Sequence, residues 1–248
     1  KRRTRATIAK EKGLEGLANT ILDQTVEKGQ LDAIVKSYID EEKEVNTEEE
    51  ALAGAMDIIA EIISDNAEYR DIVRNIANNK GIIKTEGLEM EQKSVYEMYY
   101  DYKEPIRTIP NHRILAINRG EKENILKVNL IFPDEEILSQ IKSKVIIHNS
   151  VETKGYLEDS IEDSYKRLIF PSIEREIRNN LTERAEEEAI KVFALNLKPL
   201  LMQPPVKGKT VMGIDPAFRT GCKAAVMDDT GKLLAFTTVY PTEPQNQV

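Results

Sequence analysis

The sequence predicts a mainly α-helical fold, with a multi-helical bundle and a long central helix followed by a three-stranded β-meander. Apolar residues recur at helical spacing through most of the chain, and one such stripe continues from Ile173 to Leu200. After Gln203-Pro204-Pro205 the period changes to short apolar runs. The 248 residues, 40% hydrophobic and 31% charged, suffice for one large domain or two modest ones.

Four amphipathic helices are expected in the first part of the chain. Apolar stripes at i, i+3, i+4 and i+7 spacing cover residues 14–22, 31–39, 52–63 and 69–77. Thr47 and Glu50 have the spacing of a capping box, which predicts the start of the third helix. Because none of these helices can bury its stripe alone, we expect them to pack on one another.

The middle of the chain is expected to alternate between helix and strand. We predict a helix over Val95–Tyr102 and another that opens at Pro110 and ends at Gly120. The alternation in ILKVNLIF, residues 125–132, predicts a short strand. Pro133 and the acidic residues after it indicate the start of a further helix.

A long helix is predicted from Ser172 to about Lys198. Pro171 is expected to interrupt the helix before it, because the residue preceding a proline is disfavoured in the α region. Glu174 and Arg178 have the i, i+4 spacing of a stabilising ion pair. Such a helix can be a spine between domains or a long core helix, and the sequence leaves both open.

Three strands are predicted after the proline-rich segment, at Thr210–Ile214, Cys222–Met227 and Leu233–Tyr240. The residues 228–231, Asp-Asp-Thr-Gly, form a turn signal between the last two. Three strands alone leave an exposed edge and an uncovered face, so we expect the meander to pack on the helical block, to pair with another chain or to be poorly ordered.

Composition narrows the class of protein. The net charge of −8 argues against binding nucleic acid over the whole surface, but the first residues are basic: Lys1, Arg2, Arg3 and Arg5. This cluster either neutralises phosphates or is a solvated linker, and both interpretations stay open. The single cysteine, Cys222, excludes an intrachain disulfide and favours a cytoplasmic location. No apolar run approaches the ~20 residues of a membrane helix.

One pattern suggests chemistry, the GIDP sequence that places Asp215 at the end of the first of the three predicted strands. Nucleases of the RNase H type hold divalent metal with an aspartate in this position. A metal site needs further acids, and Asp228 and Asp229 fall at the far end of the next strand. Asp215 therefore either begins a metal site or forms an Asp-Pro turn. His112 has no partner that spacing would identify, and no cofactor or metal is expected.

Several separated stretches resemble one family in the same order along the chain. They are KRRTRATIAKEKGLEGLA, ALAGAMDIIAEIISD, EPIRTIPNHRILAINRGEKENILKV, YKRLIFPSIEREIRNNLTERAEEEAIKVFALNLKPLLMQPP and VMGIDPAFRTGCKAAVMD. Together they closely resemble the bacterial Tex family of transcription accessory proteins. The resemblance implies a helical Tex N-terminal-like region with a helix-turn-helix over residues 1–170, then a long connecting helix and Pro-rich linker over 171–207. Residues 208–248 would begin a YqgF domain of RNase H-like α/β fold, left incomplete. The first residue, Lys1, and the ending PTEPQNQV fit a fragment of a longer protein.

The resemblance also implies a function, that of a nucleic-acid-binding scaffold in transcription that is not an enzyme. The expected partners are RNA, single-stranded or double-stranded DNA, and RNA polymerase or elongation factors. Asp215 is then the vestige of a metal site, because Ala217 stands where related resolvase-type sequences usually have glycine. We expect nucleic acid to contact Lys1, Arg2, Arg3, Arg5, Arg219 and Lys223. A metal-dependent nuclease or resolvase using Asp215 and a protein-interaction module remain as alternatives.

Overall fold

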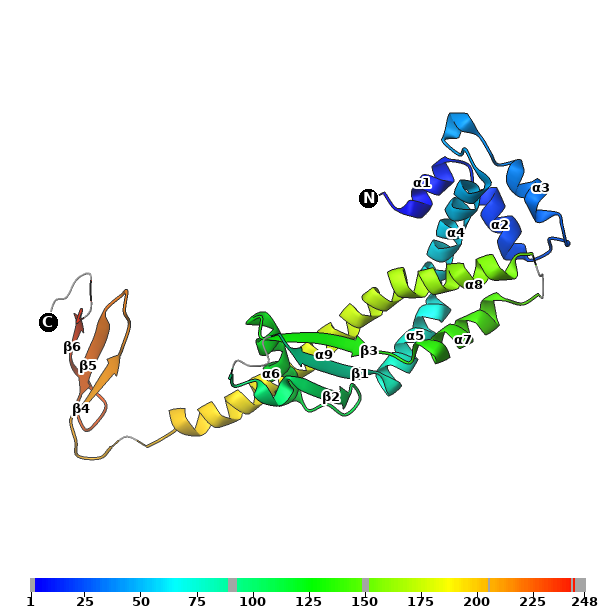
Figure 1. Cartoon of the computed structure of the whole chain (residues 1–248). Helices are drawn as coiled ribbons and strands as arrows, with labels where there is room; N and C mark the ends of the chain where they lie inside the picture. The colour runs from blue at the N-terminus through cyan, green and yellow to red at the C-terminus, as the bar shows by residue number, and fades with distance from the viewer. Residues whose placement is uncertain (1–2, 89–92, 149–151, 205, 242, 244–248) are drawn as a thin grey trace. The chain divides into compact units, whose positions relative to one another are not determined.

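The computed structural model describes all residues except 1–2, 89–92, 149–151, 205, 242 and 244–248 (Figure 1). The chain divides into two compact units, Lys1–Ala189 and Ile190–Val248. The predicted class is confirmed, with helices dominating the chain and an antiparallel sheet at its end. Within the described residues, no helix combines the length and the hydropathy that crossing a bilayer requires.

The first unit begins with a group of helices around α4. Their bounds are α1 Arg5–Glu11, α2 Glu15–Asp23, α3 Leu31–Lys36, α4 Glu48–Asp65 and α5 Ala67–Lys80, with a short 3-10 turn, η1, at Glu41–Lys43. Helix α4 contacts α1, α2 and α3 on one part of its surface and α8 on another. Ile58, Ile59 and Ile63 of α4 are buried in this group. The four predicted helices are therefore present and pack on one another as expected.

The start of α4 follows the predicted capping chemistry. The Thr47 hydroxyl accepts a hydrogen bond from the Glu50 backbone N–H at 3.2 Å. The Glu50 carboxylate turns back and accepts from the Asn46 N–H at 2.7 Å, one residue earlier than in the usual capping box. Two backbone N–H groups near the helix start thus have partners.

A three-stranded antiparallel sheet follows, formed by β1 Ile82–Gly87, β2 Asp101–Pro105 and β3 Leu126–Ile131 in the order β2-β1-β3. The strand predicted at residues 125–132 is confirmed as β3, whereas β1 and β2 were not predicted. The helix predicted over Val95–Tyr102 is wrong. This segment contains a 3-10 turn, η2 at Glu97–Tyr99, and then enters β2. Pairing of β2 with β1 supplies its backbone hydrogen bonds and overrides the local helical pattern.

Helix α6, Asn111–Lys122, packs against β3. It starts directly after Pro110, as predicted, but it does not end at Gly120. Gly120 is buried inside the helix, and a Cβ there would lie 2.6 Å from Cδ1 of Leu126. This glycine permits close approach of the helix to the sheet and does not cap it.

The remaining helices are α7 Asp134–Val145, α8 Lys154–Asp163 and α9 Phe170–Leu201, with a π-helical segment, η3, at Ser164–Ile169. The residues of α9 from Ile190 on belong to the second unit. Pro171 does not interrupt the chain's helical path, contrary to prediction. A proline ring conflicts with the carbonyl four residues earlier, which here belongs to Arg167 in the π-helical segment. We attribute the continuity to that wider turn, which moves the carbonyl out of the way of the ring.

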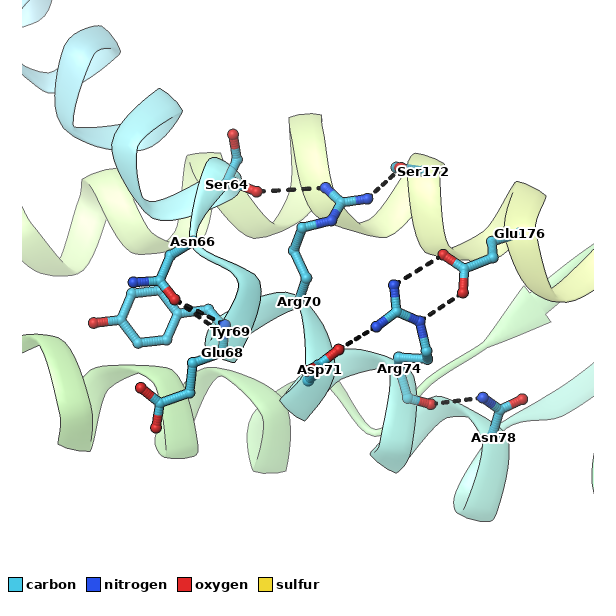
Figure 2. Close-up of polar contacts among 10 residues, drawn as sticks. All are labelled: Ser64, Asn66, Glu68, Tyr69, Arg70, Asp71, Arg74, Asn78, Ser172 and Glu176. Atoms are coloured by element: carbon cyan, nitrogen blue, oxygen red, sulfur yellow. Dashed lines mark hydrogen bonds and ion pairs between the residues drawn. The ribbon is translucent and has the colours of Figure 1, made fainter.

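Polar contacts join α5 to α9 (Figure 2). Arg70 donates to the Ser172 hydroxyl at 2.7 Å and to the Ser64 carbonyl at 3.4 Å. Arg74 donates to both carboxylate oxygens of Glu176, at 2.5 and 3.1 Å. Two long arginines on one helix face therefore fix the first part of α9 against α5.

The predicted Glu174–Arg178 pair does not form. Arg178 instead pairs with Glu121 and donates to the Asn118 amide oxygen at 3.2 Å. Glu174 accepts a hydrogen bond from the Leu130 N–H at 3.2 Å. Partners on α6 and β3 replace the intrahelical pair because α9 lies beside both elements.

The second unit contains the predicted meander. Strands β4 Val211–Asp215, β5 Cys222–Met227 and β6 Leu233–Val239 form an antiparallel sheet in sequence order. The Asp228 carboxylate accepts from the N–H groups of Thr230 and Lys232, both at 2.9 Å, and so forms the predicted turn. Apolar side chains of the sheet are exposed in this chain, with Ile214 at 62% and Phe236 at 80%.

Candidate nucleic-acid interface

Asp215 lies directly opposite Lys223 in the second unit. The register of β4 with β5 pairs these two residues, and the register of β5 with β6 pairs Lys223 with Thr238. Residues opposite one another in an antiparallel sheet have their Cβ atoms about 4.5–5.5 Å apart on the same face. An acid, a cation and a hydroxyl therefore form one row across the end of this sheet.

This row borders a shallow hollow of about 540 Å³ on one sheet face. Its floor is formed by Gly213 and Ala225, which are neighbours in the register, and Phe236 rises beside them. Small residues in the middle and larger ones around them give the face its concave form. The hollow is open to solvent, because β4 and β6 are exposed along their lengths.

The connection between β4 and β5 lies at the same end of the sheet as the row. It holds Phe218, whose side chain is 87% exposed, and Arg219, which is also exposed. Gly221 ends the connection with φ of +77°, and a Cβ there would lie 2.6 Å from the Tyr240 ring and 2.7 Å from the Thr238 methyl. Glycine is needed at this position for both conformation and space.

The two cations at this end are free to meet a ligand. Within the described part of the chain, the side chains of Arg219 and Lys223 make no hydrogen bond or ion pair. The structure thus brings together three of the residues singled out from the sequence, Asp215, Arg219 and Lys223. Sequence reasoning missed Phe218 and Tyr240, although the short β4–β5 connection was a signal that loop and strand ends would meet.

A metal site at Asp215 would need further carboxylates beside it. Among the described residues there is no group of three or more histidine, cysteine, aspartate or glutamate side chains that could hold one. Asp228 lies in the β5–β6 turn at the other end of the sheet, as expected, and hydrogen bonds, first from the Thr230 hydroxyl, lower its carboxyl pKa. A lysine opposite Asp215 supplies positive charge where a divalent cation would need further carboxylates.

The basic N-terminal cluster is placed differently. Lys1 and Arg2 lie outside the described residues. Arg3 pairs with Glu11. Arg5 opens α1 near Asp57, whose carboxyl pKa is raised by burial, against the lowering effects of Arg167 and Arg5. The described members of the cluster therefore face carboxylates of their own unit.

The His112 segment has a structural explanation. His112 is exposed at the start of α6. Arg113, the next residue, pairs with Glu104 at 3.0 Å and donates to the Tyr102 hydroxyl at 3.0 Å. These contacts tie α6 to β2 and leave no arrangement for nucleophilic catalysis among the described residues here.

The fold and the interface define a class of protein in which a helical region is followed by an antiparallel sheet. In this chain the end of that sheet carries free cations beside a single carboxylate. Family comparisons agree with the fold. The model described as Tex central region-like matches residues 27–193, and the one described as Tex protein YqgF-like domain matches residues 209–248. The chain belongs to the Tex family, which confirms the resemblance found in the sequence.

Relatives along the whole chain support this membership. The chain is 51% identical to "Uncharacterized protein YdcI" of Bacillus subtilis, with 100% of the chain and 35% of the relative covered. It is 36% identical to "Transcriptional accessory protein Tex" of Neisseria gonorrhoeae, covering 100% and 33%. It is 32% identical to human "S1 RNA-binding domain-containing protein 1", covering 96% and 25%. The chain thus spans about a third or less of the length of these relatives.

Proposed function

We propose that this chain is part of a nucleic-acid-binding scaffold that acts in transcription and has no catalytic activity of its own. The observation that carries the proposal is the family membership over both units, with relatives named for transcription and for RNA binding. Arg219 and Lys223, whose side chains lack partners among the described residues, lie at the end of the second sheet and are the proposed contacts for phosphate. Phosphate contacts of this kind supply affinity that is independent of sequence.

RNA is the favoured partner, because a relative carries it in its name, and single-stranded or double-stranded DNA is the second candidate. As the helix-turn-helix that the resemblance implied, we propose α1 and α2, which are joined by residues 12–14. Gly13 in this turn has φ of +83°. Helix α2 carries Glu15 and Asp23 and no lysine or arginine. An acidic second helix is poorly suited to enter a DNA groove, because phosphates repel its carboxylates. Duplex DNA is therefore the less favoured partner.

The proposed organisation follows the sequence boundaries. Residues 1–170 form the helical region, 171–207 the connecting helix and linker, and 208–248 the beginning of the RNase H-like domain. We place the protein in the cytoplasm, on the single cysteine and the named transcription relatives. Lys1, Arg2, Arg3 and Arg5 are proposed as a further phosphate contact, weaker than the sheet end because Arg3 and Arg5 have carboxylate neighbours.

A salt titration of the 248-residue chain with labelled single-stranded RNA tests the function. We expect binding that weakens as salt rises, and an Arg219→Gln/Lys223→Gln variant whose log–log salt slope is smaller by about 1.4, since each single-strand phosphate contact contributes about 0.7. Lys232→Gln is the matched control, because Lys232 lies by the β5–β6 turn at the opposite end. Absence of binding at low salt would sink the proposal.

The enzyme alternative is a metal-dependent nuclease or resolvase that uses Asp215. Its support is the position of this carboxylate at the end of β4. If the full-length protein cleaves nucleic acid with Mg²⁺ and loses that activity on Asp215→Asn, the scaffold proposal is wrong on this point. Cleavage that persists in Asp215→Asn points to contamination.

A second candidate function, a protein-interaction module for RNA polymerase or an elongation factor, is favoured by the end of α9. Ile190, Phe193 and Leu200 there are 67%, 65% and 61% exposed. Co-purification with purified RNA polymerase after nuclease treatment, lost on Phe193→Ser, would support it. Loss of the interaction on nuclease treatment alone would show bridging by nucleic acid.

A further inference from the structure

The β4–β5 connection gathers the two kinds of side chain that recognise unpaired nucleotides. Asp215 and Lys223 flank it in register, and residues 216–221 lie between them. Arg219 in the connection and Lys223 on β5 are the cations, and neither has a partner among the described residues. Against the single carboxylate of Asp215 the local charge is positive, in a chain whose net charge is −8.

The exposure of Phe218 has no explanation in the packing at this end of the sheet. Its ring is 87% exposed, next in sequence to Arg219. An aromatic ring in a loop gains nothing from packing at that exposure, whereas a flat face beside a cation suits a nucleobase and its phosphate. Phe193 and Phe236 are exposed as well, at 65% and 80%, but they lie on a helix and on a sheet face among other apolar residues.

The base of the connection is held in place. The Tyr240 ring and the Thr238 methyl lie so close to Gly221 that a Cβ would meet them at 2.6 and 2.7 Å. This packing fixes the point where the chain enters β5, directly before Lys223. A cation on a strand and an aromatic on an anchored loop need less ordering when a ligand binds.

We propose that residues Phe218–Lys223 bind single-stranded nucleic acid, with a base stacked on Phe218 and the adjoining phosphates on Arg219 and Lys223. The proposal rests on the proposed function and gives it a strand preference. A base within a duplex is stacked on both sides and cannot offer its face to Phe218, so duplexes are left with the two phosphate contacts alone. Asp215, opposite Lys223 in the register, would repel a phosphate that moved past the lysine.

The test measures anisotropy of labelled single-stranded RNA, single-stranded DNA of the same sequence, and the corresponding duplex. For Phe218→Leu we expect affinity for the single strands to fall about 5- to 150-fold, the range of one lost base–aromatic stack, with an unchanged salt slope. Duplex affinity should not change. Arg219→Gln should lower the salt slope for single strands and duplex alike. The RNA and DNA arms show which strand the loop prefers.

Phe193→Leu is the matched control, an exposed phenylalanine in a helix without the loop's cations, and it should bind all three ligands as the unchanged protein does. A single strand containing 2-aminopurine reports stacking directly, and its fluorescence change on binding should be lost in Phe218→Leu.

If the unchanged protein binds nucleic acid but Phe218→Leu binds single strands equally well, the inference is wrong and the proposed function stands. Loss of RNA polymerase co-purification in Phe218→Leu with intact nucleic-acid binding would also overturn it, in favour of a protein contact. If the unchanged protein binds none of the three ligands, the proposed function itself fails.

Discussion

Apolar side chains are buried in the first unit of this chain and exposed in the second. In the first unit, isoleucines such as Ile58, Ile117 and Ile141 are fully buried. In the second unit, Ile214 is 62% exposed and Phe236 80% exposed. The first unit has a continuous core that stabilises it, whereas the apolar residues of the second unit contribute little burial. Stability should therefore be lost by substitutions in the first unit, and ligand contacts by substitutions in the second.

Charged residues show the same difference. Arg74, Arg113 and Arg178 of the first unit each pair with a carboxylate on another element. Arg219 and Lys223 of the second unit have no partner among the described residues. A paired arginine is part of the scaffold, and an unpaired one beside an exposed ring is available to a ligand. The exposed ring beside Arg219 and Lys223 is the reason that we propose recognition in the shorter unit.

The largest expected effect is the loss of a core side chain from α4. Ile59 is fully buried, and Ile59→Ala should lower the free energy of unfolding by about 2–5 kcal/mol through lost burial and the cavity left behind. Chemical denaturation followed by far-UV circular dichroism measures it. Ile62→Ala is the control on the same helix, since Ile62 is 41% exposed and its loss should cost about 0.5 kcal/mol or less. Equal losses at both positions would contradict the assignment of the core.

A smaller effect is expected where α6 approaches β3. Alanine at Gly120 would place its Cβ 2.6 Å from Cδ1 and 2.9 Å from Cγ of Leu126. Overpacking of this kind costs about 1–3 kcal/mol, and the gain in helix propensity returns about 1 kcal/mol, so we expect a net loss of about 1 kcal/mol. Gly155→Ala in α8, where nothing lies within 4 Å, should instead stabilise by up to about 1 kcal/mol. A stabilising Gly120→Ala in thermal unfolding would show that Leu126 moves aside freely.

Much of this fold could be predicted from the sequence, because the helices and the meander carry their own periodic signals. The predictions for α4 and for β4–β6 needed only stripes, a cap and a turn. The segment around Val95–Tyr102 could not be predicted correctly, since its strand exists through pairing with β1, the preceding strand, which was not predicted either. Gly120 and Pro171 were misjudged for the same reason: their local preferences yield to a close helix–sheet contact and to a π-helical turn.

The candidate interface was predictable in part. The residue types and the strand order pointed to Asp215, Arg219 and Lys223, but the pairing of Asp215 with Lys223 depends on the register of the hairpin. A sequence pattern does not give the exposure of Phe218, because apolar residues in loops are often buried. The N-terminal cluster shows the converse, since basic residues adjacent in sequence face carboxylates from elsewhere in the fold.

The next effect tests whether the charge pairs of the first unit stabilise it. Arg74 lowers the pKa of the Glu176 carboxyl by hydrogen bonding and charge. A carboxyl with a lowered folded-state pKa contributes stability above its unfolded value of about 4.3, and this contribution is lost as the pH falls through the folded-state pKa. Both side chains are about one-third exposed, so solvent screens the pair and we expect a coupling of about 0.5–1 kcal/mol at neutral pH.

A double-mutant cycle with Arg74→Met and Glu176→Gln, measured at neutral pH and again at acidic pH, gives this coupling. It should vanish at the acidic end. Lys166→Met is the control, because the Lys166–Glu162 pair lies within one helical stretch and joins no separate elements. A coupling that is the same at both pH values would mean that Glu176 contributes through packing and not through its charge.

The smallest effect belongs to the second unit and tests the comparison most directly. Phe236 lines the hollow beside Gly213 and Ala225, and its ring is 80% exposed. Phe236→Thr replaces an aromatic residue of β6 by a β-branched one, so strand propensity is retained while the ring is lost. Since an exposed ring has little burial to lose, we expect the stability of this sheet to change by less than about 0.5 kcal/mol.

Amide hydrogen exchange of peptides from β5 and β6 measures this change, because exchange reports the opening of one unit separately from the other. Protection that falls at least tenfold would mean that the ring is covered in solution, by a second copy or another part of the longer protein, and the second unit would then resemble the first in how it is stabilised.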